Sequence, residues 1–531
     1  MKLKELHINN FKFFPKQDAK SPLPKIDEKN LLIYGENGSG KSTIYWALYT
    51  LLESSFKKTD ADVAKYFEYR GLNGLVNIHA SRLRHNTFIK AVLKDGATTK
   101  DYLISGNLPV IQAIRADSAV RESGMASEFI NYKILHGLHQ ARNSVENNLF
   151  DWFAHEILPY IRTQSTLTFE EVFNELRKGP RKVQDLAGDT IFAHAALRTD
   201  PDAGMQSNFR FYRAWDNKVQ RWKNEFTIFI RKINARANQI LQNDFQQNIE
   251  FKLEFTPPRY NVIGTAIASP GDLTNLNWHE PQIVIKIPRY RGTPNAVKKA
   301  HSFLNEAKWT AIGLSIRLAI LEDVTYRPSP VDLKCLVMDD MLLSLDMSNR
   351  DIVLNLLLDR YVNDYQLILM THDRYFFELA KGKINARNAG NNWLKLEMYE
   401  DEVSNRLQPL ILDSKSNLGK AKAFFKQKEF SASANHMRKA TECFVYEFVP
   451  KSHHYDRNFQ EFNLSQLINK SRALARLAGW PANVISELDL MRTNVFNPGS
   501  HYDVYTPVFQ TDLKRALETL DQVCVHATMN L

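Results

Sequence analysis

The stretch GENGSGKST, residues 35–43, follows the apolar run LLIY and precedes the helical pattern KSTIYWALYTLLESS. Glycine lacks a Cβ atom, so backbone N–H groups in such a stretch can approach and wrap a chain of phosphates. The positive end of the following helix points at the same anion. A strand, a glycine-rich turn and a helix in this order predict a phosphate-binding loop. The pattern GxxxxGK[ST] fits at Gly35, Gly40, Lys41 and Ser42.

The polar side chains of this loop have distinct expected roles. Lys41 is placed to reach the β- and γ-phosphates, and the Ser42 hydroxyl is placed to bind Mg²⁺. The predicted cofactors are therefore ATP and Mg²⁺. The predicted nucleotide-binding residues of the loop are Asn37, Gly38, Gly40, Lys41, Ser42 and Thr43.

A second strand supplies the carboxylates that a phosphate-binding loop needs. LKCLVMDD is an apolar strand pattern that ends in Asp339 and Asp340. We expect Asp339 to serve the metal and Asp340 to orient the attacking water. Acidic residues also cap ordinary strands, so the pair gains weight from its position before SLDMSNR and LILMTHD.

The length and composition of the chain limit the class of protein to which it can belong. A chain of 531 residues is too long for one compact core, which predicts two or three domains. Apolar runs such as AIGLSIRLAIL are too short to span a bilayer, and the N-terminus lacks the pattern of a secretory signal. Three widely spaced cysteines fit a reducing cytoplasm, and they exclude a disulfide framework. The expected location is cytoplasmic, with no membrane partner.

The charge balance is basic. Lys plus Arg exceed Asp plus Glu by 69 − 59 = 10. This excess favours a polyanionic partner, nucleic acid first, although a basic solvated surface would give the same total.

The patterns divide the chain into four segments. Strand patterns occur at KLKELHINNFKFF, LVNIHASRL, TFIKAVLK and DYLISG, and they return at IEFKLEF and PQIVIKIP around a helical region. After DSKSNLG the pattern is almost entirely helical. We expect a nucleotide-binding domain in two parts, at residues 1–110 and 246–412. A helical insert at residues 111–245 separates the two parts, and a helical C-terminal domain follows at residues 413–531.

The order of these motifs resembles the ABC-type ATPase heads of the SMC, Rad50 and RecF group. The resemblance covers residues 1 to about 385 and predicts an α/β head of mixed sheets around a phosphate-binding core, with a helical insert and an all-α C-terminal domain. It identifies FLNEAKWTAIGLS as the signature segment, with nucleotide-binding candidates Asn305 and Glu306. It also assigns Asp346 of SLD to the D-loop and His372 to the switch.

In that group two heads close face to face around two ATP molecules, and the signature loop of one head caps the γ-phosphate held by the other. The resemblance therefore implies a head-to-head dimer. In this chain Asn305 replaces the usual signature serine, and Asp340 replaces the usual glutamate. We expect slow hydrolysis, with ATP acting more as a clamp than as a motor.

The segments KNLLIYGENGSGKSTIYWALYTLL, YFEYRG, LVMDDMLLSLDMSNR and MTHDRYFFELA resemble compact bacterial anti-phage ATPases. These include the ATPase subunits of Septu-type and retron-associated systems, and the heads of anticodon nucleases. The resemblance implies control of a toxic nuclease, either a partner subunit or the chain's own C-terminal domain, with DNA or tRNA as the nucleic acid. The alternatives are a RecF- or Rad50-like ATPase of DNA repair or DNA structuring, and an ATP-dependent scaffold without nuclease activity.

The helical tail contains three nuclease candidates. Arg438 and Glu442 lie four residues apart, on one face of a predicted helix, and His501 follows NPGS. The trio resembles the Arg, Glu and distant His of HEPN-like domains in anticodon nucleases, where His acts as acid or base and Arg stabilises the phosphate. In the alternative without nuclease activity, Arg438 and Glu442 form a surface salt bridge and NPGS is a structural turn. The domain would then serve dimerisation or partner docking.

Overall fold

The computed structural model describes residues 1–16, 23–81, 86–138, 148–177, 206–262, 276–297, 299–323, 331–340, 345–387, 389–403, 405–414, 416–496 and 509–527. The described chain forms two compact units. Unit 1 comprises Met1–Phe376 and Met398–Leu410, and unit 2 comprises Phe377–Glu397 and Ile411–Leu531. Residues 377–397, which the sequence analysis places in the second part of the head, thus associate with the C-terminal segment.

A six-stranded sheet lies mostly in unit 1, while the start of β13 and the end of β14 are assigned to unit 2. Its order is β14-β13-β2-β12-β11-β5, and the four strands from β2 to β5 run parallel. Every residue of β2, β11 and β12 is buried, which explains their continuous apolar sequences. The strands span Asn30–Gly35 (β2), Glu128–Asn131 (β5), Cys335–Asp339 (β11), Gln366–Thr371 (β12), Trp393–Val403 (β13) and Arg406–Asp413 (β14).

Three strands of this sheet differ from the sequence prediction. β5 lies inside the segment 111–245, predicted as a helical insert, yet it pairs with β11 from Glu128 to Asn131. A strand of four residues between two helices is too short to show a period of two. β13 and β14 were not predicted at all, although β13 is the neighbour of β2. The parallel part of the sheet therefore includes a strand from the segment assigned to the insert.

A second sheet pairs β1 (Lys2–Asn9), β3 (Phe88–Asp95) and β4 (Thr98–Ser105) in antiparallel register. LVNIHASRL, residues 75–83, is predicted as a strand, but its described residues 75–81 form a loop with one isolated bridge, between Val76 and Phe11. Its backbone is bound to the segment after β1, because Lys12 N–H donates to Leu75 O at 2.6 Å and Asn77 Nδ2 donates to Lys12 O at 2.8 Å.

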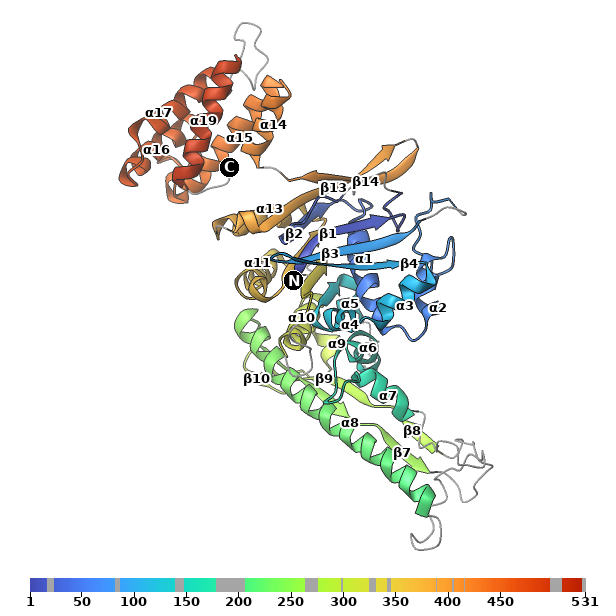
Figure 1. Ribbon diagram of the computed structural model, residues 1–531. Coiled ribbons are helices and arrows are strands. Elements are labelled where there is room, and N and C mark those ends of the chain that lie inside the picture. The colour runs from blue at the N-terminus through green and yellow to red at the C-terminus, as the bar shows by residue number, and fades with distance from the viewer. Residues whose placement is uncertain are drawn as a thin grey trace. The chain divides into compact units, whose positions relative to one another are not determined.

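Helices cover the sheets of unit 1 (Figure 1). α1 (Lys41–Glu53) follows β2, and α10 (Glu306–Glu322) is buried from Trp309 to Leu321. The remaining helices are α2 (Asp60–Ala64), α3 (Leu108–Ala116), α4 (Ser118–Ala126), α5 (Tyr132–Gly137), α6 (Phe150–Glu156), α7 (Phe169–Arg177), α8 (Gln206–Gln239), α9 (Ala300–Phe303), α11 (Met347–Leu356), α12 (Val362–Asp364) and α13 (Arg374–Ala386), the last continuing into unit 2.

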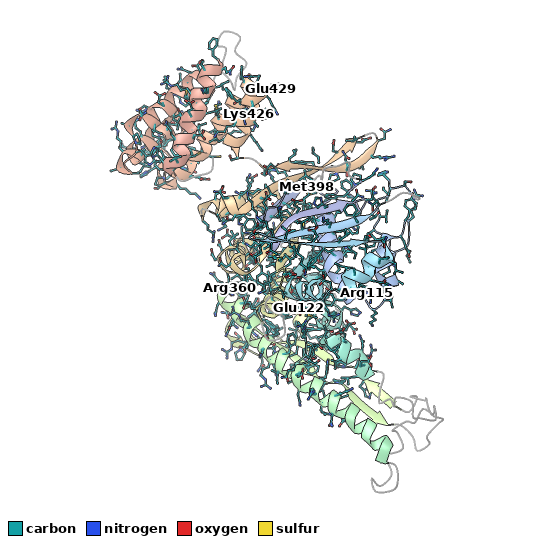
Figure 2. All side chains as sticks on the ribbon, in the orientation of Figure 1. Arg115, Glu122, Arg360, Met398, Lys426 and Glu429 are labelled. Atoms are coloured by element: carbon teal, nitrogen blue, oxygen red, sulfur yellow. The ribbon has the colours of Figure 1, made fainter. Side chains whose placement is uncertain are left out.

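The long helix α8 packs on a third sheet. Asn234 and Asn238 donate side-chain hydrogen bonds to carbonyls of β6, at 3.0 and 2.7 Å. Asp244 follows the end of α8 and pairs with Arg360 (labelled in Figure 2) at 3.0 Å. Arg360 also pairs with Glu322 at 3.0 Å. The strands here are β6 (Ile249–Thr256), β9 (Gln282–Tyr290) and β10 (Thr293–Pro294), with a separate pair β7 (Arg259–Val262) and β8 (Leu276–His279).

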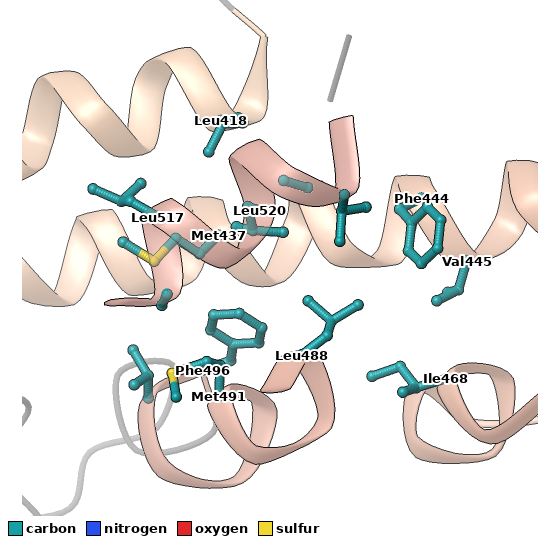
Figure 3. Close-up of a cluster of buried hydrophobic side chains, with 14 of the residues drawn as sticks. Leu418, Met437, Phe444, Val445, Ile468, Leu488, Met491, Phe496, Leu517 and Leu520 are labelled. Atoms are coloured by element: carbon teal, nitrogen blue, oxygen red, sulfur yellow. The ribbon is translucent and has the colours of Figure 1, made fainter. Parts of the chain in front are cut away.

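Unit 2 contains a helical bundle with its own core, as the sequence predicts for residues after 413. Figure 3 shows Phe444 and Val445 of α15 with Leu488 and Leu520 from two other helices in this core. The helices are α14 (Asn417–Lys426), α15 (Phe430–Phe448), α16 (Leu464–Leu477), α17 (Ala482–Met491) and α19 (Gln510–Ala527). Among the helices of the described residues, none combines the length and apolar character needed to cross a bilayer.

One buried side chain joins the first two sheets. Gln366, at the start of β12, accepts a hydrogen bond from Leu3 N–H at 2.7 Å. Its amide nitrogen donates to Leu3 O at 3.1 Å and to Lys29 O at 2.7 Å. Gln366 thus satisfies backbone groups of β1 and of the segment before β2.

Replacing Gln366 by Leu should destabilise unit 1 by about 3 kcal/mol, because three buried backbone groups lose their partner. The measurement is the first transition in urea unfolding. Gln220→Leu, on the exposed face of α8, loses one exposed bond to Asp216 and serves as the control. Equal shifts for the two variants would contradict the role given to Gln366.

Candidate nucleotide-binding site

The loop between β2 and α1 has the backbone that its glycines predict. Gly38 and Gly40 have φ values of 94° and 92°, the left-handed region that favours glycine. A Cβ atom at Gly40 would lie 2.7 Å from the Phe13 ring, and one at Gly35 would lie 2.9 Å from Met398 O. The segment before β2 and strand β13 therefore hold this loop close on two sides.

Lys41 lies folded across the loop. Its side chain is 5% exposed, and Nζ donates to Gly35 O at 2.5 Å and to Glu36 O at 3.2 Å. Burial lowers the pKa of this ammonium group, while Asp340 and Asp339 act in the opposite direction. A cation held by carbonyls at the start of a helix is placed to exchange them for phosphate oxygens.

Asp339 is the last residue of β11 and lies beside Ser42. The carboxylate is buried, and burial is the main cause that raises the Asp339 pKa, while the neighbouring Ser42 hydroxyl acts in the opposite direction. Within the described residues, Asp339 Oδ1 is buried without a hydrogen-bond partner. Mg²⁺ prefers hydroxyl and carboxylate oxygens. An unpartnered buried carboxylate oxygen beside a hydroxyl therefore fits a Mg²⁺ ion.

Asp340 and His372 contact each other at the same edge of the sheet. Asp340 Oδ1 accepts the backbone N–H of His372 at 2.8 Å, and His372 Nδ1 lies 3.0 Å from the same oxygen. Asp340 Oδ2 lies 4.0 Å from Lys41 Nζ. The His372 side chain is 31% exposed, so it is not a core histidine. Both catalytic candidates thus lie next to the phosphate-binding loop.

Asp346 begins α11 as its N-cap. It accepts hydrogen bonds from the backbone and the side chain of Asn349, at 2.9 and 3.1 Å. Ser344 of the predicted D-loop lies outside the described residues. The role of Asp346 in nucleotide binding stays a prediction.

Arg350 was missed by sequence reasoning. Its Nε donates to Leu345 O at 2.8 Å, and its Nη1 lies 2.5 Å from Asp373, directly after His372. Arg350 therefore links the predicted D-loop to the predicted switch. No motif or residue spacing around SNRD indicates from the sequence that this arginine makes the two contacts.

The signature candidates lie at the exposed start of α10. Asn305 caps the helix by accepting Lys308 N–H at 3.1 Å, and Glu306 accepts a hydrogen bond from Tyr132 at 2.7 Å. In the part of the chain that the structure describes, neither hydrogen-bonds to the phosphate-binding loop of its own copy. Binding to a nucleotide on another copy stays a prediction.

A second missed residue, Arg317, anchors α10. It is buried, pairs with Glu128 of β5, and donates to Glu156 O at 2.7 Å. Arg317 therefore fixes the predicted signature helix against the strand that neighbours β11. The sequence hides it within the apolar run AIGLSIRLAIL.

The tail candidates are only partly described. Arg438 Nε lies 3.1 Å from Glu442 Oε1 on α15, with side chains 30% and 38% exposed. His501 lies outside the described residues. The structure thus brings together two members of the trio, in a geometry that an ordinary surface ion pair also has.

Residues 1–91 match a family model described as an AAA ATPase domain. The match contains β1, β2, the phosphate-binding loop and α1, so this part of the chain is similar to that family. A comparison with curated proteins finds no match.

Three solved structures are similar to this chain. The Smc head domain of Pyrococcus furiosus, with an extended coiled coil and bound to the C-terminal domain of ScpA, is 13% identical over 81% of this chain and 99% of that chain, with a TM-score of 0.38. The SMC head domain from Thermotoga maritima is 14% identical over 78% and 100%, with a TM-score of 0.34. The recombination mediator protein RecF with ATP is 13% identical over 70% and 92%, with a TM-score of 0.37.

Asp339→Asn should have opposite effects with and without nucleotide. Without Mg²⁺ and ATP it should stabilise the protein by about 1 kcal/mol, because it removes a buried charge. Mg²⁺ binds the ionised carboxylate, and the pKa of Asp339 is raised. Mg²⁺-dependent stabilisation by ATP should therefore weaken as the pH falls toward that pKa, and it should be lost in the variant at every pH.

Thermal unfolding across a pH series, with and without Mg²⁺ and ATP, measures both effects. Asp364→Asn, at an exposed position of the same unit, should change neither. Full Mg²⁺-dependent stabilisation in Asp339→Asn would remove this residue from the metal site.

Proposed function

We propose that the chain is an ATP-dependent clamp of an anti-phage defence system. Two copies close around two ATP molecules, and the closed state controls a nuclease. The observation that carries the ATPase part is the buried Asp339 oxygen beside Ser42, with Lys41 across the same loop. The defence and nuclease parts rest on the sequence resemblance of the loop, acidic strand and switch segments.

The residues of the site explain binding of the triphosphate. Ser42 and Asp339 would hold Mg²⁺, which when bound neutralises charge on the phosphates. Lys41 gives up its bonds to Gly35 O and Glu36 O and turns its three donors to the phosphates. The N–H groups of the glycine-rich turn and the start of α1 bind the remaining oxygens.

The contacts of Asp340 support slow hydrolysis. To orient the attacking water, this carboxylate must offer it an acceptor oxygen. Its Oδ1 already accepts the backbone N–H of His372, and its Oδ2 lies 4.0 Å from Lys41 Nζ. Both oxygens are thus partly engaged by the protein, which leaves less acceptor capacity for the water and favours a long-lived ATP state, as a clamp requires.

Closure of two heads can be tested at Asn305. Asp caps helices as well as Asn does, whereas its charge would face the γ-phosphate of the other copy. Asn305→Asp should therefore abolish ATP-dependent dimerisation, and Asn305→Ser, a neutral cap, should retain it. Analytical ultracentrifugation with ATP in the slow-hydrolysing Asp340→Asn background measures the dimer.

The Lys41→Ala variant should stay monomeric with ATP, because it loses the triphosphate. If Asn305→Asp dimerises as well as Asn305→Ser, the start of α10 does not face a phosphate in the closed state. ATP binding by each variant, measured separately, keeps failure of the site distinct from failure of the dimer.

Nuclease activity in the tail predicts cleavage of total tRNA by the purified chain. Arg438→Ala and His501→Ala should reduce the rate at least 100-fold, a typical loss for a group that stabilises a phosphate or transfers a proton. Arg476→Ala, an exposed arginine of the same unit, should leave the rate unchanged. The exposed pair of Arg438 and Glu442 contributes little to stability, so the variant should fold.

Other outcomes favour other assignments. Without cleavage, stable capture of a nuclease subunit places the toxic activity in a partner, and an adjacent gene for an HNH nuclease or reverse transcriptase supports that assignment. ATP hydrolysis stimulated by DNA, with neither cleavage nor capture, favours a RecF- or Rad50-like role in repair.

A further inference from the structure

A short hairpin in unit 2 exposes aromatic side chains to solvent. Residues 451–461, which we call the 451–461 hairpin, connect α15 to the segment before α16, and Tyr455 pairs with Glu461 across it. Phe459 near its tip is 88% exposed and Tyr455 is 50% exposed. Two exposed aromatic rings on one short segment offer a stacking surface, which a single exposed apolar side chain does not.

The hairpin is held in one conformation. The Asp456 carboxylate accepts N–H groups of Asn458 and Gln460 at 2.7 and 2.9 Å, and Asp456 N–H donates to Gln460 O at 2.9 Å. Phe459 N–H donates to Asp456 O at 3.1 Å, and Phe459 has a φ of 59°, which is rare for a bulky residue. The backbone that carries the ring is therefore already held by hydrogen bonds before any binding.

The hairpin is anchored beside the tail candidates. His454 is buried, and its Nε2 lies 2.7 Å from Val449 O. Tyr446 of α15 donates to Glu461 at 2.9 Å. Arg438, Glu442 and Tyr446 are four residues apart in turn, so they share one face of α15. That face runs from the Arg438 pair to the base of the hairpin.

The hairpin carries two cations and two carboxylates, so its formal charge is zero. The carboxylates of Asp456 and Glu461 accept the hydrogen bonds described above. Lys451 and Arg457 are exposed, and within the described residues neither makes an ion pair. Two unpaired cations interleaved with two exposed aromatic rings combine a backbone contact with a stacking surface, as surfaces that bind single-stranded nucleic acid do.

We propose that the 451–461 hairpin binds single-stranded nucleic acid, with Phe459 and Tyr455 stacking on unpaired bases and Arg457 and Lys451 contacting phosphates. A duplex hides its base faces, so it would lose the stacking contribution. The inference deepens the proposed nuclease control by giving unit 2 a substrate surface next to Arg438. It does not require that the chain itself cleave the strand.

The test uses the full-length chain and fluorescein-labelled oligouridine and oligothymidine of about 15 nucleotides, a length that covers typical sites. Fluorescence anisotropy should show binding to at least one of them, and a matched duplex should bind more weakly. Phe459→Ala should weaken binding about tenfold or more, and Phe459→Trp should restore it. Arg457→Ala should reduce the slope of log affinity against log salt by about 1.

The matched control is Leu477→Ala, which removes an equally exposed apolar side chain from α16 and should not change the affinity. Both alanine variants should keep the wild-type melting temperature, since neither touches the core. The RNA and DNA arms decide which sugar the surface prefers. Equal affinity of Phe459→Ala and wild type, or no binding of either strand, would overturn the proposal.

Two further measurements separate this inference from the proposed function. Binding should persist in Lys41→Ala without nucleotide, so failure of the ATP clamp leaves it intact. It should also persist in Arg438→Ala if that residue acts in cleavage. If Phe459→Ala prevents capture of a protein subunit but leaves oligonucleotide affinity unchanged, the hairpin is a protein-docking element and the proposal is wrong.

Discussion

The proximity of Ser42 and Asp339 is the feature on which the site depends. It brings the first turn of α1 to the end of β11, across the intervening strand β12. Parallel pairing of β2, β12 and β11 brings their carboxyl ends to one edge, so residues nearly 300 positions apart meet there. Burying a carboxylate is costly unless it is paired, and the unpartnered oxygen of Asp339 makes sense when a cation completes the site.

Elements outside the phosphate-binding loop also contact this edge of the sheet. Arg350 contacts the carbonyl before Asp346 and the carboxylate after His372, so it connects the predicted D-loop with the predicted switch. On the other side of β11, the ion pair of Arg317 and Glu128 holds α10 against β5. The helix that begins at the signature candidates is thus connected to β11 through β5.

The sequence predicts those parts of the site that have a local sequence pattern, and it does not predict contacts between distant elements. The phosphate-binding loop, Asp339 and His372 follow apolar strands, and period and turn residues identify such positions without tertiary information. β13 was not predicted, because its position beside β2 depends on pairing over hundreds of residues. LVNIHASRL has strand-forming residues but finds backbone partners in a loop, since β1 is already paired with β3. The Arg317 pair has no sequence signal, because its partner lies on another element.

Unit 2 poses a different problem, since its helices carry no motif as specific as the loop. Its buried cluster includes Phe444, Leu488 and Leu520 from three helices, so it has a core of its own. A unit with its own core can change its surface without loss of the ATP site. The exposed rings and unpaired cations of the 451–461 hairpin are therefore not a by-product of folding the head. They add nothing to either core, and together they have the aromatic and cationic groups that a single-stranded nucleic acid can contact.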